Sequence, residues 1–110
     1  TCCGLDSKVF YKKSRKEKSL IDLSMIETLK KYKHKSLEFF PFGSDERQYN
    51  SPGIDIPFGA FMRVNYDGYK EYHTSLDNKK IINFKYLSDS FSGCCSKILA
   101  TFYSISFILS

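Results

Sequence analysis

Acidic and imidazole side chains gather in one stretch of this sequence, between residues 43 and 77. Asp45 and Glu46 follow an apolar run of strand length from Leu37 to Phe42. Because ligands bind beyond the carboxyl ends of strands in α/β sheets, we expect these two carboxylates to stand at such a place. His73 comes after two further turn signals, which favour a chain that folds back and brings its imidazole near Asp45. A carboxylate and a neutral imidazole suit a divalent metal such as zinc. On spacing alone, a capping aspartate and a hydrogen-bonded histidine are the alternative.

Short motifs in this stretch carry a resemblance to a known family. They are Gly-Ser-Asp-Glu-Arg-Gln-Tyr from Gly43, followed by Ser-Pro-Gly, then Gly-x-x-Met-Arg from Gly59, and Tyr-His-Thr-Ser-Leu-Asp from Tyr72. The sequence resembles bacterial aminopeptidase-like proteins described as polysaccharide-biosynthesis proteins with an aminopeptidase-like domain. These are similar in turn to the di-zinc aminopeptidases, whose Ser-Asp and Tyr-His-Thr motifs stand in the same order.

The resemblance continues upstream and covers about Thr1 to Asp77. It includes Thr1-Cys2 with Gly4, Tyr11-Lys12 with Ser14-Arg15, and Ile21-Asp22. It implies an α/β fold, as part of a zinc-exopeptidase-like three-layer sandwich with a mixed, mostly parallel sheet. Residues 1–90 would be the carboxyl-terminal part of the aminopeptidase-like domain. Residues 91–110 are expected to be a divergent apolar tail, because Lys97 is the single charge from Ser90 onward.

The resemblance also implies a metal site with two zinc ions in the complete domain. By motif, Asp45 corresponds to the carboxylate ligand of one zinc and His73 to the histidine ligand of the other. In the resembled proteins the remaining ligands and the general base come from segments before the position of Thr1, so no catalytic residue is assigned in this sequence. Asn50 stands where a cysteine is common in those proteins.

Side chains beside the proposed ligands are candidates for the substrate pocket: Glu46, Arg47, Tyr49 and Tyr72. Glu46 follows the ligand position and is not expected to be the general base. For Tyr72, the alternative to a place in the substrate pocket is packing of its ring with the hydroxyl exposed, and it explains the residue equally well.

Local patterns predict the elements that must position these residues. Ser19 is a plausible N-cap for a helix from Leu20 to Lys33, with an apolar stripe at Ile21, Met25, Leu29 and Tyr32. Its last turn would carry Lys30, Lys31 and Lys33, where cations favour the negative end of the helix dipole. Strands are expected at 37–42 and 60–64, and residues 81–87 suggest a helix or a short strand.

Composition limits the class of protein. A sequence of 110 residues with net charge +5 fits one small domain at most, and its basic residues concentrate between Lys8 and Lys35. A nucleic-acid-binding module would rest on that cluster alone, without a recognised motif, so no nucleic-acid partner is expected.

Residues 98–109 are too short an apolar run to span a bilayer, for which about 20 residues are needed. We expect no membrane partner.

Four cysteines occur as two adjacent pairs, Cys2-Cys3 and Cys94-Cys95, and no signal-peptide pattern opens the sequence. We therefore expect reduced thiols and a cytoplasmic protein.

These observations lead to one function and one alternative. The leading interpretation is part of a zinc-dependent aminopeptidase-like hydrolase that cleaves an amide or peptide bond next to a free amine. The link to surface polysaccharide biosynthesis makes a peptide or an amino-sugar-like small molecule the expected substrate. The alternative is a catalytically inactive remnant or a small binding module.

Overall fold

A three-stranded mixed sheet lies at the centre of the computed structural model, which describes residues 3–41, 45–65 and 68–95. The elements in chain order are β1 (Val9–Lys12), α1 (Leu20–Leu29), β2 (His34–Leu37), α2 (Asp45–Tyr49) and β3 (Ala60–Met62). Residues 84–95 are also helical. The strand order is β2-β1-β3, with β1 parallel to β2 and antiparallel to β3.

The expected α/β class is confirmed by this arrangement. The described strands form one parallel and one antiparallel pair. A mostly parallel sheet and a three-layer sandwich therefore stay predictions for a complete domain.

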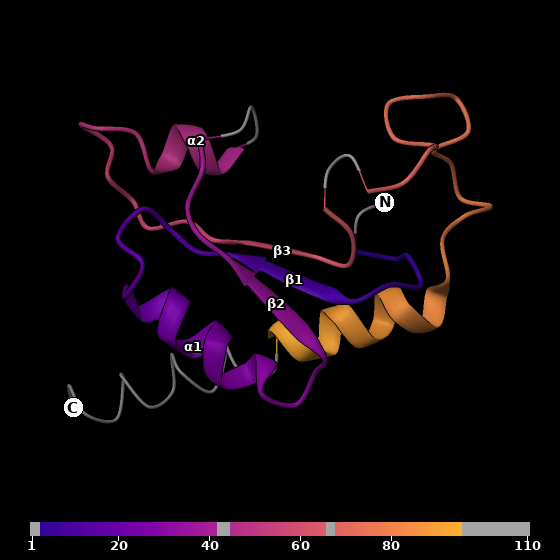
Figure 1. The fold of residues 1–110 in the computed structure, drawn as a ribbon, viewed down its shortest axis with the longest axis horizontal. Coiled ribbons are helices and arrows are strands. Elements are labelled where there is room, and N and C mark those ends of the chain that lie inside the picture. Colours follow the sequence, from indigo (N-terminus) through magenta and orange to yellow (C-terminus); the bar gives the residue numbers. More distant parts are fainter. Residues whose placement is uncertain (1–2, 42–44, 66–67, 96–110) are drawn as a thin grey trace.

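The core is built from alternate residues of β1 and one face of α1. Val9 and Tyr11 share one face of the sheet and pack with Met25 and Leu29. The partly buried Ile21, Tyr32, Phe61 and Cys94 surround this cluster. The helical stripe predicted from the sequence is thus the surface that faces the sheet. Figure 1 shows α1 and the helix at residues 84–95 along the same side of the sheet.

The start of α1 is as predicted, and its end is not. Ser19 is the N-cap and forms a capping box with Asp22. The helix ends at Leu29 instead of Lys33, so its last turn contains no basic residue. The amides of Lys31 and Tyr32 bond to the carbonyls three residues earlier, which tightens the chain into a turn. The chain leaves this turn and enters β2.

The strand expected at residues 37–42 was misplaced. β2 occupies His34–Leu37 and pairs with β1 in the register Val9 to His34 through Lys12 to Leu37. Its first three side chains are exposed, so the strand is held by backbone pairing and leaves no apolar signal in the sequence. Phe40 lies outside the ladder and is 63% exposed.

The elements expected at residues 60–64 and 81–87 are present with different bounds. β3 falls within the predicted strand at 60–64 but ends at Met62, and the following Arg63 and Val64 are buried. The ambiguous segment at 81–87 contributes to the helix at residues 84–95. Of the expected tail, residues 91–95 continue this helix, and the rest lies outside the described residues. No helix in the described ranges is long and apolar enough to cross a membrane.

Candidate functional site

The helix that begins at Asp45 is anchored to the sheet by an ion pair. Lys12 of β1 and Glu46 of α2 are 5% and 2% exposed, and the Lys12 ammonium donates to the Glu46 carboxylate. The same ammonium donates to the Phe40 carbonyl at 3.3 Å. Two buried opposite charges in direct contact are costly to separate, because either one alone would lose its direct counter-charge. Glu46, a candidate for the substrate pocket, is therefore assigned to holding α2 in place.

Asn50 joins three segments just after α2. Its amide nitrogen donates to the carbonyls of Glu46 and Phe58 at 2.7 and 2.8 Å. Its amide oxygen accepts from the backbone N–H groups of Arg15 and Phe58 at 3.0 and 3.3 Å. These four bonds use the donors and acceptor of a single side chain that is 2% exposed. A cysteine at this position could not form them.

Asp22 is the centre of a second buried network, beneath the Tyr11 to Arg15 motif. It is fully buried and accepts hydrogen bonds from the Tyr11 hydroxyl and the Ser14 amide, each at 2.8 Å. The hydroxyls of Ser14 and Ser19 also donate to it. Burial on its own raises the pKa of Asp22, but these hydrogen bonds outweigh burial and hold its pKa below the ordinary value. The carboxylate is thus charged and fully engaged.

Asp45 and Arg47 point away from these anchors. Both are exposed, while the intervening Glu46 is buried, so α2 presents one side to the sheet and the other to solvent. Tyr49 is 44% exposed and stacks on Phe58, with ring centroids 4.8 Å apart. Within the part of the chain that the structure describes, Asp45 makes no ion pair.

His73 lies in an unusual backbone conformation. Its φ is 59°, in the left-handed region that a non-glycine residue seldom adopts. The exposed imidazole stacks on the Tyr72 ring at 4.1 Å between centroids, and Tyr72 meets Tyr69 edge to face at 5.5 Å. Tyr72 therefore supports the imidazole with its ring. A strained backbone beneath an exposed imidazole is a feature that functional sites often carry.

The structure does not bring the two proposed metal ligands together. Helix α2 lies near one end of the molecule, and the segment that follows residues 66–67 lies at the other (Figure 1). Among the described residues, no three histidine, cysteine, aspartate or glutamate side chains gather in a way that could hold a metal ion. Asp45 and His73 are suitable donors individually, and they do not form a closed site here.

Three anchoring residues carried little signal in the sequence. Lys12 and Asp22 belonged to motifs without an assigned role, and Asn50 stood out only as a departure from cysteine. Each gains its role from partners that the fold brings to it. Asn50, for example, bonds to the amide of Arg15, 35 residues earlier.

Comparison with known proteins places these features in context. Over 54 residues, 49% of its length, the chain is 54% identical to a Clostridium acetobutylicum protein named "Putative polysaccharide biosynthesis protein with aminopeptidase-like domain". It also matches a structure described as "Crystal structure of putative peptidase" from Clostridium acetobutylicum, with a TM-score of 0.79 and 36% identity over 96% of the chain. The chain spans 12% of the first relative and 24% of the second.

The family model described as "Domain of unknown function (DUF4910)" matches residues 1–102, nearly the whole sequence. That match includes the anchored helix α2, the left-handed His73 and part of the expected tail. The chain therefore belongs to the DUF4910 family, whose relatives described here are named for an aminopeptidase-like domain and a peptidase.

Proposed function

We propose that this chain is one part of an aminopeptidase-like, zinc-dependent hydrolase that cleaves an amide or peptide bond next to a free amine. The names of its relatives support the peptidase class and a link to polysaccharide biosynthesis. Because the chain spans only 12% and 24% of those relatives, the activity is proposed for the complete assembly and not for this chain alone. The substrate we propose is a peptide or an amino-sugar-like small molecule.

The observation that carries this proposal is a division among the residues of the resembling motifs. Tyr11, Lys12 and Ser14 are buried and bonded inside the fold, and so is Glu46. Asp45 and His73 are exposed. Motif residues that the fold leaves exposed are the ones available for a ligand.

In the complete domain, Asp45 would serve as a ligand of one zinc ion and His73 as a ligand of the other. Such ions lower the pKa of bound water and polarise the carbonyl that is cleaved. Two zinc ions in one site would need ligands that are near neighbours. A shared site therefore requires the segment at residues 68–83 to approach α2 more closely than it does in this structure.

The residues of this chain have defined tasks in the proposed site. The Lys12–Glu46 pair and Asn50 hold α2, so that Asp45 is presented from a fixed base. Tyr72 supports the imidazole of His73. Arg47 and Tyr49, on the exposed side of α2, are proposed to contact the substrate.

A reduced, cytoplasmic setting is part of the proposal. Cys3, Cys94 and Cys95 are free thiols. Burial, aided by the neighbouring Cys3 and Cys95, raises the pKa of the Cys94 thiol to about 11. A thiol with such a pKa stays protonated near neutral pH, which agrees with an unreactive structural role.

A chimera tests the function most directly. This chain would replace the matching quarter of the Clostridium acetobutylicum protein whose crystal structure is similar, with the unmodified protein as control. We expect the chimera to bind zinc and to release nitroaniline from an aminoacyl-nitroanilide, and we expect Asp45→Ala and His73→Ala each to lose one metal and nearly all activity. Glu46→Gln should reduce stability more than turnover. A His73→Ala chimera that keeps two metals would show that the ligand assignment is wrong.

A further inference from the structure

His73 lies in a segment that has no regular secondary structure to hold it. Residues 68–83 form turns and bends without a helix or a strand (Figure 1). The backbone of His73, with a φ of 59°, is in a conformation that costs free energy and persists only where its surroundings enforce it. Contacts within this segment must therefore fix both the backbone and the ring of His73.

Backbone hydrogen bonds close short turns on both sides of His73. The backbone amides of Tyr72 and Thr74 bond to carbonyls three residues earlier, at 3.3 and 3.0 Å. The backbone amide of Asp77 bonds to the Thr74 carbonyl at 3.1 Å, and the Thr74 hydroxyl donates to the Glu71 carbonyl at 2.7 Å. These bonds curl the main chain around residue 73. None of them involves the imidazole, so they do not set its orientation.

Three side-chain contacts connect the imidazole to a carboxylate four residues further along the chain. The imidazole lies on the Tyr72 ring, with 4.1 Å between the centroids and 18° between the planes. Tyr72 meets Tyr69 edge to face, with 5.5 Å between the centroids. The Tyr69 hydroxyl donates to the Asp77 carboxylate at 2.7 Å, in partly buried surroundings. Each contact restricts the ring that follows it, and the series ends at the imidazole.

The hydrogen bond between Tyr69 and Asp77 spans eight residues and encloses His73. It is short and its acceptor is a carboxylate, so it is stronger than a bond between neutral groups. Contacts between aromatic rings are weak individually, and a stacked pair stays fixed only if one of its rings is held. The bond to Asp77 therefore determines how firmly the stack beneath the imidazole is fixed.

We propose that Asp77 and Tyr69 are positioning residues for His73. They hold Tyr72, and Tyr72 holds the imidazole in a fixed orientation toward the zinc ion of the proposed site. This inference rests on the proposed function, because it takes His73 as a ligand of that site. A ring that is fixed beforehand loses less conformational freedom when it binds, so its affinity is higher than that of a freely rotating ring. Neither Asp77 nor Tyr69 needs to touch the zinc ion.

Proton nuclear magnetic resonance of the 110-residue chain without metal tests the positioning directly. A ring stacked on a tyrosine experiences the ring current of that tyrosine. The His73 ring protons should therefore resonate at higher field than those of free histidine. His34 is the other histidine of the sequence, and His34→Gln identifies its signals. All spectra are recorded at about pH 8.5, well above the ordinary pKa of histidine, so that protonation does not change between variants.

Three variants separate the hydroxyl–carboxylate bond from the rings. Tyr69→Phe removes the hydroxyl and keeps the ring, and Asp77→Ala removes the acceptor. Each should lose most of the upfield shift of the His73 ring protons. Asp77→Asn should keep most of it, because the amide oxygen can still accept the hydrogen bond. If Asp77→Ala does not fold, Tyr69→Phe decides the outcome.

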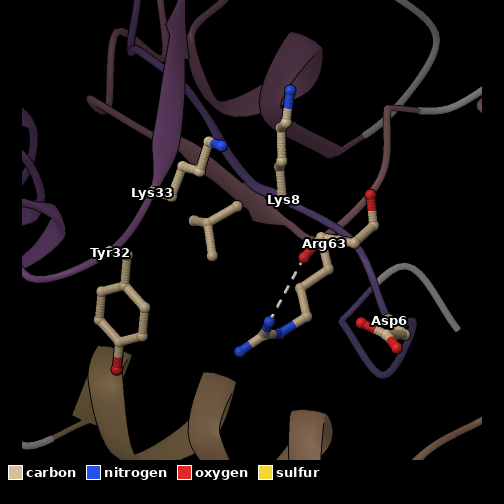
Figure 2. Close-up of a pocket in the computed structure, with 7 residues that line it drawn as sticks. Asp6, Lys8, Tyr32, Lys33 and Arg63 are labelled. Carbon is tan, nitrogen blue, oxygen red and sulfur yellow. Dashed lines mark hydrogen bonds between the residues drawn. The ribbon is translucent and has the colours of Figure 1, made fainter.

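Tyr86→Phe is the matched control. It also removes a tyrosine hydroxyl that is hydrogen-bonded to an aspartate, Asp6. Asp6 lines a pocket of about 420 Å³ together with Arg63 (Figure 2), and none of residues 69–77 lines that pocket. The control should leave the His73 signals unchanged. Unchanged signals in both Tyr69→Phe and Asp77→Ala, or an equal loss in Tyr86→Phe, would overturn the positioning.

The zinc affinity of the chimera separates this inference from the proposed function. Tyr69→Phe in the chimera should weaken zinc binding by about tenfold, the effect of losing a group that orients a metal-bound histidine. Asp77→Asn should leave the affinity nearly unchanged. A chimera that binds no zinc, while the isolated chain shows the expected losses of shift, would overturn the proposed function and still support the positioning. Zinc binding that Tyr69→Phe does not weaken would overturn the positioning alone.

Discussion

The hydroxyl of Tyr11 occupies the place where a side chain on residue 59 would begin. A Cβ atom added to Gly59 would lie closer to that hydroxyl and its ring than non-bonded atoms can approach. Tyr11 in turn donates to the buried Asp22 at 2.8 Å and is itself 1% exposed. The glycine of the Gly-x-x-Met-Arg motif is thus required by packing against the core.

Gly59→Ala should therefore destabilise the chain. The added methyl must displace the Tyr11 ring and strain its bond to Asp22, at a cost of about 1–3 kcal/mol. Urea unfolding followed by circular dichroism measures the loss. Ser88→Ala, on the exposed side of the helix at residues 84–95, is the control and should change stability by no more than about 0.5 kcal/mol. Equal stability of Gly59→Ala and wild type would show that Tyr11 can move aside freely.

Acid should destabilise the fold through Asp22. The pKa of Asp22 is lower in the folded chain than its ordinary value, so its contribution to stability is complete above about pH 4. That contribution is lost as the pH falls from there toward the folded-state pKa. Asp22→Asn should reduce the free energy of unfolding at pH 7 and flatten its dependence below pH 4. Urea unfolding between pH 2.5 and 7 measures both effects, with Asp45→Asn as a control for loss of an exposed carboxylate.

Lys12 and Glu46 should be coupled in their contribution to the free energy of unfolding. Lys12→Met and Glu46→Leu should each destabilise the chain by about 3–5 kcal/mol, because each removes the direct counter-charge of a buried group. The double variant should recover much of that loss, since two apolar side chains need no partner. A double-mutant cycle by urea unfolding gives the coupling. Additive losses would mean that the two charges do not interact.

Isolated from any further chain, these residues should bind zinc weakly and hydrolyse nothing. The described residues gather no three potential metal ligands, and one ligand per ion cannot hold two ions. Calorimetry with zinc chloride and an aminoacyl-nitroanilide assay measure both properties. Micromolar binding at two sites together with metal-dependent turnover would overturn this expectation.

Removing residues 90–110 and removing only residues 96–110 should have opposite effects on this chain. Ser90 is buried, accepts from Arg63 and donates to the Cys3 carbonyl at 2.8 Å, so removing residues 90–110 should destabilise the chain. Removing only residues 96–110, an apolar stretch with one charge, should improve solubility and preserve the far-ultraviolet signal. Light scattering and circular dichroism of the two truncated chains provide the comparison.

Local signals in the sequence were enough to predict α1 and the position of β3. The Ser19 cap and the stripe at Met25 and Leu29 are short-range features, and the structure contains both. β2 could not be predicted, because three of its four side chains face solvent and its backbone is paired by the register with β1. The burial of Glu46 also depends on its ion-pair partner Lys12, which lies 34 residues earlier in the sequence. Residues next to Glu46, such as Asp45, therefore did not indicate that it would be buried.

The hydrogen bonds of Asn50 differ in how far they reach along the chain. Those to Glu46 and Phe58 close loops of four and eight residues, whereas the bond from the Arg15 amide closes a loop of 35 residues. Closing the longer loop costs more chain entropy, by roughly 1.3–2 kcal/mol on a logarithmic scale of loop length. We expect the turn around Asn50 to assemble early in folding and the first strand to join it later. The Asn50 side chain thus influences the order in which these segments assemble as well as their positions in the fold.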